Sequence, residues 1–261
     1  MKIEKTLLAL LVLVLAFGGC AGRKTVAPMP DADIVVAADG SGDYRTIGRA
    51  IDAADDGDVI LVRPGRYEEE VEVEDVDDIE LIGSGPGMTI IDADDGYAAL
   101  ALNCDGVIVS GFTLTGAGSH GIYVKDGHHM IDHCLVYDND DRGIYISNMF
   151  GEGSAEIEYC TIVDNEVSGI YSVDDNDDTE ISYCIIARNG RGIVSDANEG
   201  GMTIEYNVLD NETENFDRVP EGEGNIVDDP GFLAPHAGDY HLEAGSPAID
   251  IDGMGNNAGC F

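Results

Sequence analysis

The chain has 261 residues, enough to bury a sizeable core as one elongated domain or two compact ones. It carries 52 acidic and 13 basic residues, a formal net charge of −39, which repels nucleic acid, anionic lipid and polyanionic glycans, so we expect no nucleic-acid partner. The charge fits either adaptation to high salt or binding of divalent cations, and the 34 glycines suit short strands joined by tight turns.

The N-terminus predicts a targeting segment. Lys2 and Lys5 precede an apolar run of about a dozen residues, which is too short to span a bilayer. The run ends in small residues directly before Cys20, an order that resembles the lipobox of bacterial lipoproteins, in which the cysteine receives lipid after signal cleavage. We expect a lipoprotein signal peptide at residues 1–19, lipid on Cys20 and a tether at residues 20–33. An ordinary signal peptide with an unmodified cysteine is the alternative.

The segment after the tether predicts short strands around one helix. Residues 34–37 and 59–62 are apolar runs of strand length. Thr46 fits the N-cap of a short helix. The apolar residues of this helix recur on one face and are Ile47, Ala50, Ile51 and Ala54. An array of stacked strands needs a cap, because its first member otherwise leaves strand edges bare, so we expect a short N-terminal capping helix.

Two motifs then recur at one period. Gly-Ile-Tyr begins at residues 121, 143 and 169 and Gly-Ile-Val at residue 192, at intervals of 22, 26 and 23 residues. In the same phase, each of three cysteines is followed five residues later by an asparagine. The pairs are Cys134 and Asn139, Cys160 and Asn165, and Cys184 and Asn189. Repeats of this length indicate a solenoid, because a single coil cannot bury its own apolar face.

We interpret the cysteine and asparagine positions as scaffold. The odd number of cysteines after Cys20 does not indicate a disulfide framework, so we expect the repeated cysteines to form an inward stack of free thiols. Zinc is a weak rival, because no Cys-x-x-Cys pair or suitably spaced histidine supports it. The repeated asparagines, joined by Asn211 in the last coil, are expected to hydrogen-bond along the stack and to turn backbone.

Three strands and a turn in each coil resemble the right-handed parallel β-helix of pectin-lyase-like proteins. Asp-Gly-Ser-Gly-Asp at residues 39–43 and Pro-Gly-Arg-Tyr at residues 64–67 are similar to the N-terminal cap of pectin methylesterases. Asp-Pro-Gly-Phe at residues 229–232 looks like part of the closing segment of bacterial right-handed β-helix repeat proteins. The resemblance implies an all-β fold, a right-handed single-stranded parallel β-helix at residues 34–228 with a C-terminal closing segment at residues 229–261.

The resemblance is specific for the fold and says little about activity. The catalytic aspartates of pectin methylesterases lie in mid-helix motifs with neighbouring Gln, Trp and Arg, and this sequence has no such motif and no Trp. We therefore disfavour esterase activity. With 6 Phe and 11 Tyr, the chain is also expected to lack aromatic platforms on which a glycan could stack.

The acidic turns that follow the Gly-Ile-Tyr strands are candidate metal sites. Asp174, Asn176 and Asp178 alternate, and their oxygens could hold Ca²⁺; solvated turn residues of an acidic protein are the alternative. A lyase acting on uronates would use Ca²⁺ to bind the substrate carboxylate and a base to remove the α-proton. The candidate bases and substrate-binding residues are Lys125, Arg142, Arg188 and Arg191. Arg142 and Arg191 lie two coils apart and should share a face, although such arginines often only pair with nearby acids.

Four of the six histidines lie close together in the sequence, at His120, His128, His129 and His133. We expect His128 and His129 to lie in a turn, where neutral imidazoles could bind a transition metal or act as acid–base groups. Exposed turn histidines without a function are the favoured alternative, because the cluster does not recur on adjacent coils.

These observations predict an extracytoplasmic lipoprotein, anchored to the cell envelope through lipid, that is a non-catalytic surface or carbohydrate-binding protein. A Ca²⁺-dependent polysaccharide lyase, or another carbohydrate-active enzyme of the pectin-lyase-like superfamily, is the alternative. The expected partners are a polysaccharide and the membrane. The glycan, the membrane concerned and the oligomeric state are left open.

Overall fold

A computed structural model describes residues 31–147, 153–173, 178–197 and 201–261. The chain divides into two units, Met1–Asp31 and Ala32–Phe261, and the second contains all the described strands and helices. The predicted signal peptide and Cys20 lie outside the described residues. No helix of the described residues has the length and apolar character needed to cross a membrane.

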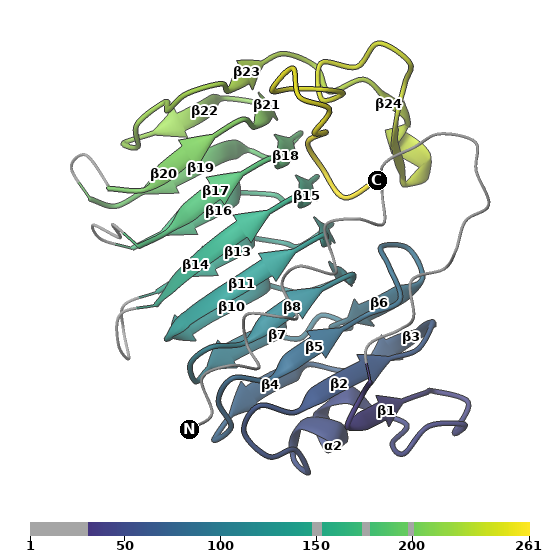
Figure 1. The fold of residues 1–261 in the computed structure, drawn as a ribbon. Coiled ribbons are helices and arrows are strands. Elements are labelled where there is room, and N and C mark those ends of the chain that lie inside the picture. Colours follow the sequence, from purple (N-terminus) through teal and green to yellow (C-terminus); the bar gives the residue numbers. More distant parts are fainter. Residues whose placement is uncertain (1–30, 148–152, 174–177, 198–200) are drawn as a thin grey trace. The chain divides into compact units, whose positions relative to one another are not determined.

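Most strands of the second unit belong to three parallel sheets, which we name A, B and C (Figure 1). Sheet A consists of β1 (Ile34–Val36), β2 (Val59–Val62), β5 (Glu80–Ile82), β8 (Ile108–Ser110), β11 (His128–Asp132), β14 (Ser154–Glu158), β17 (Glu180–Ser182) and β20 (Thr203–Glu205). Sheet B consists of β3 (Gly65–Glu68), β6 (Thr89–Asp92), β9 (Thr113–Thr115), β12 (Leu135–Tyr137), β15 (Thr161–Val163), β18 (Ile185–Ala187), β21 (Val208–Asp210) and β23 (Ile226–Val227). Sheet C consists of β4 (Val71–Glu74), β7 (Ala98–Asn103), β10 (His120–Asp126), β13 (Arg142–Ile146), β16 (Ser168–Ser172), β19 (Arg191–Ser195) and β22 (Glu214–Asp217).

Each coil supplies one strand to sheet A, then one to sheet B and one to sheet C, and seven complete coils run from β2 to β22 in the described part of the chain. Every strand in the three sheets pairs with the strand of the same sheet one coil away, in parallel register. The all-β parallel solenoid that the repeats predict is therefore confirmed.

The helix predicted near the N-terminus is a single short one, α2 (Ile47–Ile51), and a capping role for it stays a prediction. Its apolar residues are buried, but the side chain of Thr46 makes no capping hydrogen bond. The carboxylate of Glu69 does so instead, accepting the N–H groups of Ile47 and Gly48 at 2.8 and 3.1 Å. This contact satisfies donors that a helix N-terminus otherwise leaves without partners.

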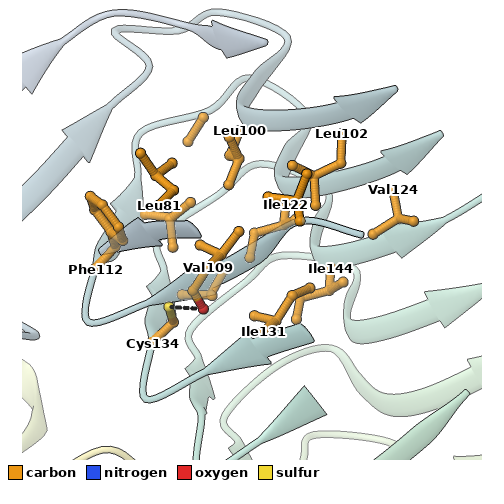
Figure 2. Close-up of a cluster of buried hydrophobic side chains, with 14 of the residues drawn as sticks. Leu81, Leu100, Leu102, Val109, Phe112, Ile122, Val124, Ile131, Cys134 and Ile144 are labelled. Atoms are coloured by element: carbon orange, nitrogen blue, oxygen red, sulfur yellow. Dashed lines mark hydrogen bonds between the residues drawn. The ribbon is translucent and has the colours of Figure 1, made fainter. Parts of the chain in front are cut away.

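The interior of the coils is packed with aliphatic side chains from all three sheets. Figure 2 shows Leu100 and Ile122 of sheet C facing Val109 and Ile131 of sheet A across this core. The isoleucine of each Gly-Ile-Tyr motif points inward and lies in register with its counterparts on the neighbouring coils. Because side chains alternate along a strand, the following tyrosine points outward.

The first residue of each motif must be glycine because other groups fill the space beside it. A Cβ on Gly143 would lie 2.6 Å from Cγ2 of Ile162 and 2.7 Å from the carbonyl oxygen of Gly169. Gly121 and Gly169 are equally crowded. The repeat therefore encodes a close approach between backbone and core at one corner of each coil.

That corner is built from asparagines. The side-chain amide of Asn139 donates to Asn165, that of Asn165 to Asn189, and that of Asn189 to Asn211, each at 2.9 Å. The same amides also donate to backbone carbonyl oxygens of their own coil or the preceding one. Each amide thus ties two coils together.

A second column of buried side chains begins at Cys134, Cys160 and Cys184, all free and fully buried. The thiols of Cys160 and Cys184 donate to the carbonyl oxygens of Ile131 and Ile157 on the preceding coil, each at 3.5 Å. Burial raises the pKa of the Cys134 and Cys160 thiols well above the ordinary value, so they are protonated. Asn207 takes the next place in the column and accepts the backbone N–H of Cys184 at 2.8 Å.

Residues 229–261 pack against sheet B. They include an antiparallel pair, β24 (Phe232–Ala234) and β25 (Asp239–Leu242), separated by the 3-10 helix η1 (Pro235–Ala237). The apolar contact joins Phe232, Tyr240, Ala248 and Ala258 to Leu135, Val163, Ile185 and Val208. The hydroxyl of Tyr240 also donates to Asp164 at 2.9 Å, so this segment occupies the outer face of sheet B.

Candidate functional site

The outer face of sheet C carries a line of tyrosines. Tyr123, Tyr145 and Tyr171 are register partners on β10, β13 and β16. Their ring centroids lie 5.1 and 5.8 Å apart, with interplanar angles of 26° and 56°. Each is the third residue of a Gly-Ile-Tyr motif, so the repeat that builds the core also builds this line.

Two further rings extend the line. Tyr97, directly before β7, is 56% exposed, and its ring centroid lies 5.9 Å from that of Tyr123. The ring centroid of His120 lies 5.5 Å from that of Tyr123 and 4.6 Å from that of Tyr145. We refer to Tyr97, His120, Tyr123, Tyr145 and Tyr171 as the aromatic row. Tyr97 is the exposed member of the row, Tyr145 and Tyr171 are half-buried, and His120 and Tyr123 are buried, so the expectation that the chain lacks aromatic platforms stays a prediction.

His120 is the buried centre of the aromatic row. It is 2% exposed, and its Nε2 lies 3.4 Å from the hydroxyl of Tyr97. Burial, and then the positive charge of Arg142, lower the pKa of His120 to about 4. The imidazole is consequently neutral at neutral pH.

Two of the predicted substrate-binding cations lie over the row. The guanidinium carbon of Arg142 is 4.9 Å from the ring centroid of Tyr145 and 4.4 Å from that of Tyr171. Arg142 is also ion-paired with Asp141. Nζ of Lys125 lies 5.5 Å from the ring centroid of Tyr123. Both cations thus contact rings of the aromatic row through cation–π interactions.

The third predicted cation, Arg191, lies on β19 of the same sheet and pairs with Asp217 at 2.8 Å. Ser168 of β16 is the register partner of Arg142 and lies between the two arginines, one coil from each. Its hydroxyl is buried and has no hydrogen-bond partner among the described residues. Arg188 belongs elsewhere, since it follows β18 of sheet B and pairs with Asp164 at 2.8 Å.

The histidines expected in one turn do not form a cluster. His128 and His129 are the first residues of β11, so their side chains point to opposite faces of sheet A. Nδ1 of His128 lies 2.8 Å from the hydroxyl of Ser154. His129 is 1% exposed, with Nε2 2.7 Å from the carbonyl oxygen of Asp126 and Nδ1 accepting a backbone N–H. The two imidazoles therefore do not converge on one metal ion.

The predicted calcium ligands are only partly described. Asp174 and Asn176 lie outside the described residues, and Asp178 is an exposed turn residue before β17. Within the part of the chain that the structure describes, no group of three or more His, Cys, Asp or Glu side chains is arranged to hold a metal ion. The calcium site stays a prediction.

A second aromatic stack occupies the corner between sheets A and B. It consists of His133, Tyr159, Tyr183 and Tyr206, with centroid distances of 5.1, 5.1 and 5.4 Å. The interplanar angles of 23°, 10° and 8° mean that these rings cover one another's faces. In the aromatic row, by contrast, several rings are steeply tilted. The face-to-face stacking gives the corner stack a structural character.

The aromatic row was not expected from the sequence, although the repeats contain a signal for part of it. An inward isoleucine followed by a tyrosine at three equivalent positions implies one outward ring per coil. Tyr97 and His120 carried no such signal, because neither belongs to the repeated motif.

Known proteins resemble this chain in two regions. The family model for right handed beta helix regions matches residues 87–228, and the pectinesterase family model matches residues 33–118. Pectinesterase 2 of Citrus sinensis is 42% identical over 73 residues, which cover 26% of this chain and 14% of that protein. A pectinesterase/pectinesterase inhibitor of Ficus pumila var. awkeotsang is 44% identical over 66 residues, covering 23% of this chain and 12% of that protein. Both matches are thus confined to a small part of the relatives' length.

The fold is also found in solved structures. The pectin methylesterase from carrot superposes with a TM-score of 0.51 at 21% identity, over 71% of this chain and 65% of that one. The likeness concerns the fold. Because the β-helix model spans more than half of the chain and the parallel coils agree with it, the chain belongs to the right-handed β-helix family of pectin-lyase-like proteins, with a pectinesterase-like region at residues 33–118.

Proposed function

We propose that the protein binds an extended polysaccharide along the outer face of sheet C. The aromatic row is the observation that carries this proposal, since its five rings come from four successive coils of one sheet. Strands in a sheet lie about 4.8 Å apart, so the row extends for about 15 Å across the coils. An aromatic ring with a polar tip suits a ligand that has both apolar ring faces and hydroxyl groups.

Polar groups beside the row support the same ligand class. Charged pairs such as Arg142 with Asp141 supply several donors and acceptors within reach of a chain lying on the rings. The names of the relatives, pectinesterases and a pectin methylesterase, also favour a polysaccharide as the ligand class.

Affinity electrophoresis tests this function. The compact unit Ala32–Phe261 should be retarded in native gels that contain pectin, alginate or a neutral glycan, whichever polysaccharide it binds. Tyr145→Ala removes the central ring of the row and should raise the apparent Kd at least about fivefold, because interfacial aromatic anchors typically contribute more than 1 kcal/mol. Tyr183→Ala is the matched control, since it removes a half-buried ring from the corner stack. Equal retardation of both variants, or none of the wild type on any polysaccharide, would refute the proposal.

Catalysis on the bound glycan is the second candidate function. The pectinesterase match at residues 33–118 favours it, and so does the neutral imidazole of His120 beside Asp141 and Arg142. The test is to incubate the protein with pectin and with alginate, with and without Ca²⁺, and to measure methanol and unsaturated products. Activity that requires Ca²⁺ and is lost on Asp178→Asn would support the lyase version. No product in any condition would leave the binding function alone.

The proposed setting is the cell envelope. Support comes from the lipobox-like sequence before Cys20, which would tether the β-helix outside the cytoplasm. A tethered binding face would concentrate the polysaccharide near the cell surface.

A further inference from the structure

We propose that the polysaccharide recognised by sheet C is electrically neutral, an inference that rests on the glycan-binding function proposed above. The relevant observation is how the charges on this face are compensated. A polyuronate would need free cations to receive its carboxylates, and a polyamine would need free carboxylates directly at the rings.

The strands of sheet C carry three cations in the described residues, and each is already paired with a carboxylate. Lys125 lies 2.5 Å from Glu72, Arg142 pairs with Asp141, and Arg191 lies 2.8 Å from Asp217. In addition, Lys125 and Arg142 are engaged with the rings of the aromatic row. The positive charge of each cation is thus already compensated by a protein carboxylate, so the face offers an anion no cation with an uncompensated charge.

The surroundings make an anionic ligand less favourable still. On the same sheet, Glu74 and Glu214 are exposed and form no ion pair within the described part of the chain, and they lie on β4 and β22, which carry no ring of the aromatic row. His120, the remaining titratable nitrogen base in the row, is uncharged at neutral pH because it is buried. The formal charge of the whole chain is −39, and its field opposes the approach of any polyanion.

The same pairs suit a ligand that has only hydroxyl groups. A guanidinium or ammonium group that is held by a carboxylate keeps further N–H donors, and the carboxylate keeps further lone pairs. A sugar hydroxyl can donate to one and accept from the other without breaking the pair. A neutral glycan therefore gains the stacking and the hydrogen bonds without the cost of separating ion pairs.

The experiment is isothermal titration calorimetry on the compact unit Ala32–Phe261 with three sets of hexasaccharides. The sets are neutral hexasaccharides of glucose, xylose and mannose, a hexagalacturonate, and a hexaglucosamine. We expect at least one neutral hexasaccharide to bind at least about tenfold more tightly than either charged one in about 0.1 M salt. Its Kd should change less than about twofold when the salt is raised to about 1 M, where the Debye length falls to about 3 Å.

A designed variant sharpens the test. Asp141→Asn frees the guanidinium of Arg142 from its carboxylate and should shift the preference toward hexagalacturonate, measured as the ratio of the two Kd values. Glu68→Gln makes the same change of net charge on an exposed residue of sheet B and should leave the ratio unchanged.

The outcomes separate the two proposals. Tighter binding of hexagalacturonate or of hexaglucosamine by the wild type, in the titration or with the corresponding polymers in gels, overturns the neutral class while the binding function stands. A ratio that moves equally in Asp141→Asn and Glu68→Gln shows that net charge, and not the pairing on sheet C, sets the preference, and also overturns it. Absence of binding to every oligomer and polymer refutes the binding function itself.

Discussion

Tyr145 is the register partner of Tyr123 on the neighbouring coil, and their rings stack with centroids 5.1 Å apart. The relationship repeats once more toward Tyr171 and then ends, because Val194 takes the equivalent place on β19. At the other end, Ala101 is the partner of Tyr123, and Tyr97 supplies a ring from outside the motif. The row is therefore a bounded surface whose length is set by which coils carry tyrosine.

The asparagine ladder should be essential for stability. Asn165→Ala removes an amide that donates to Asn189, Val136 and Val163 and accepts from Asn139, all in a buried corner. Leaving buried groups without partners should lower the free energy of unfolding by about 3 kcal/mol. Urea denaturation measures this, with the exposed Asn256→Ala as control. A loss below about 1 kcal/mol would contradict the role assigned to the ladder.

Glycine should be irreplaceable at the motif but not in the helix. Gly143→Ala places a Cβ 2.7 Å from the carbonyl oxygen of Gly169, so the coil must shift, and we expect a loss of about 2 kcal/mol. Gly48→Ala meets only the carboxylate of Glu69 at 3.5 Å and improves helix propensity, with an expected gain of up to about 1 kcal/mol. Thermal melting of the two variants should move in opposite directions; similar shifts would show that crowding at Gly143 does not matter.

His120 should make the protein less stable in acid. Its folded pKa, about 4, lies below the value of about 6.5 expected when it is unfolded. The unfolded state therefore binds the proton first, and stability is lost as the pH falls from about 6.5 to about 4, by up to about 3 kcal/mol. Half-buried carboxyl groups such as Glu158, whose pKa is raised mainly by desolvation, act in the opposite sense.

The difference between variants isolates this contribution. His120→Gln should show a smaller loss of unfolding free energy between pH 7 and pH 4.5 than the wild type, while the exposed His236→Gln should follow the wild type. Parallel pH profiles for the wild type and His120→Gln would mean that folding leaves the pKa of His120 unchanged, which contradicts the prediction.

Cys20 should receive lipid in a bacterial host. Metabolic labelling with a radioactive fatty acid should label the wild-type protein, and Cys20→Ser should abolish both the label and membrane association. Cys260→Ser, which also removes one cysteine, should retain both. Labelling that persists in Cys20→Ser would exclude lipidation at this cysteine.

The sequence by itself determined the solenoid. Isoleucine directly after glycine, and cysteine and asparagine at a constant separation, all recur at one period, and such repetition has few structural solutions. These features are local to a coil, so they can be recognised without knowing how one coil meets the next.

Only the tertiary structure decided which residues form the face that binds. The coils differ in length, at 22, 26 and 23 residues, and the register of Tyr123, Tyr145 and Tyr171 shows that the extra residues leave the stacking unchanged. The structure also places the side chains of His128 and His129 on opposite faces of a strand, Tyr97 against His120, and Asp217 beside Arg191. Such contacts join different coils or opposite sides of a strand, and they depend on corner geometry that no spacing in the sequence encodes.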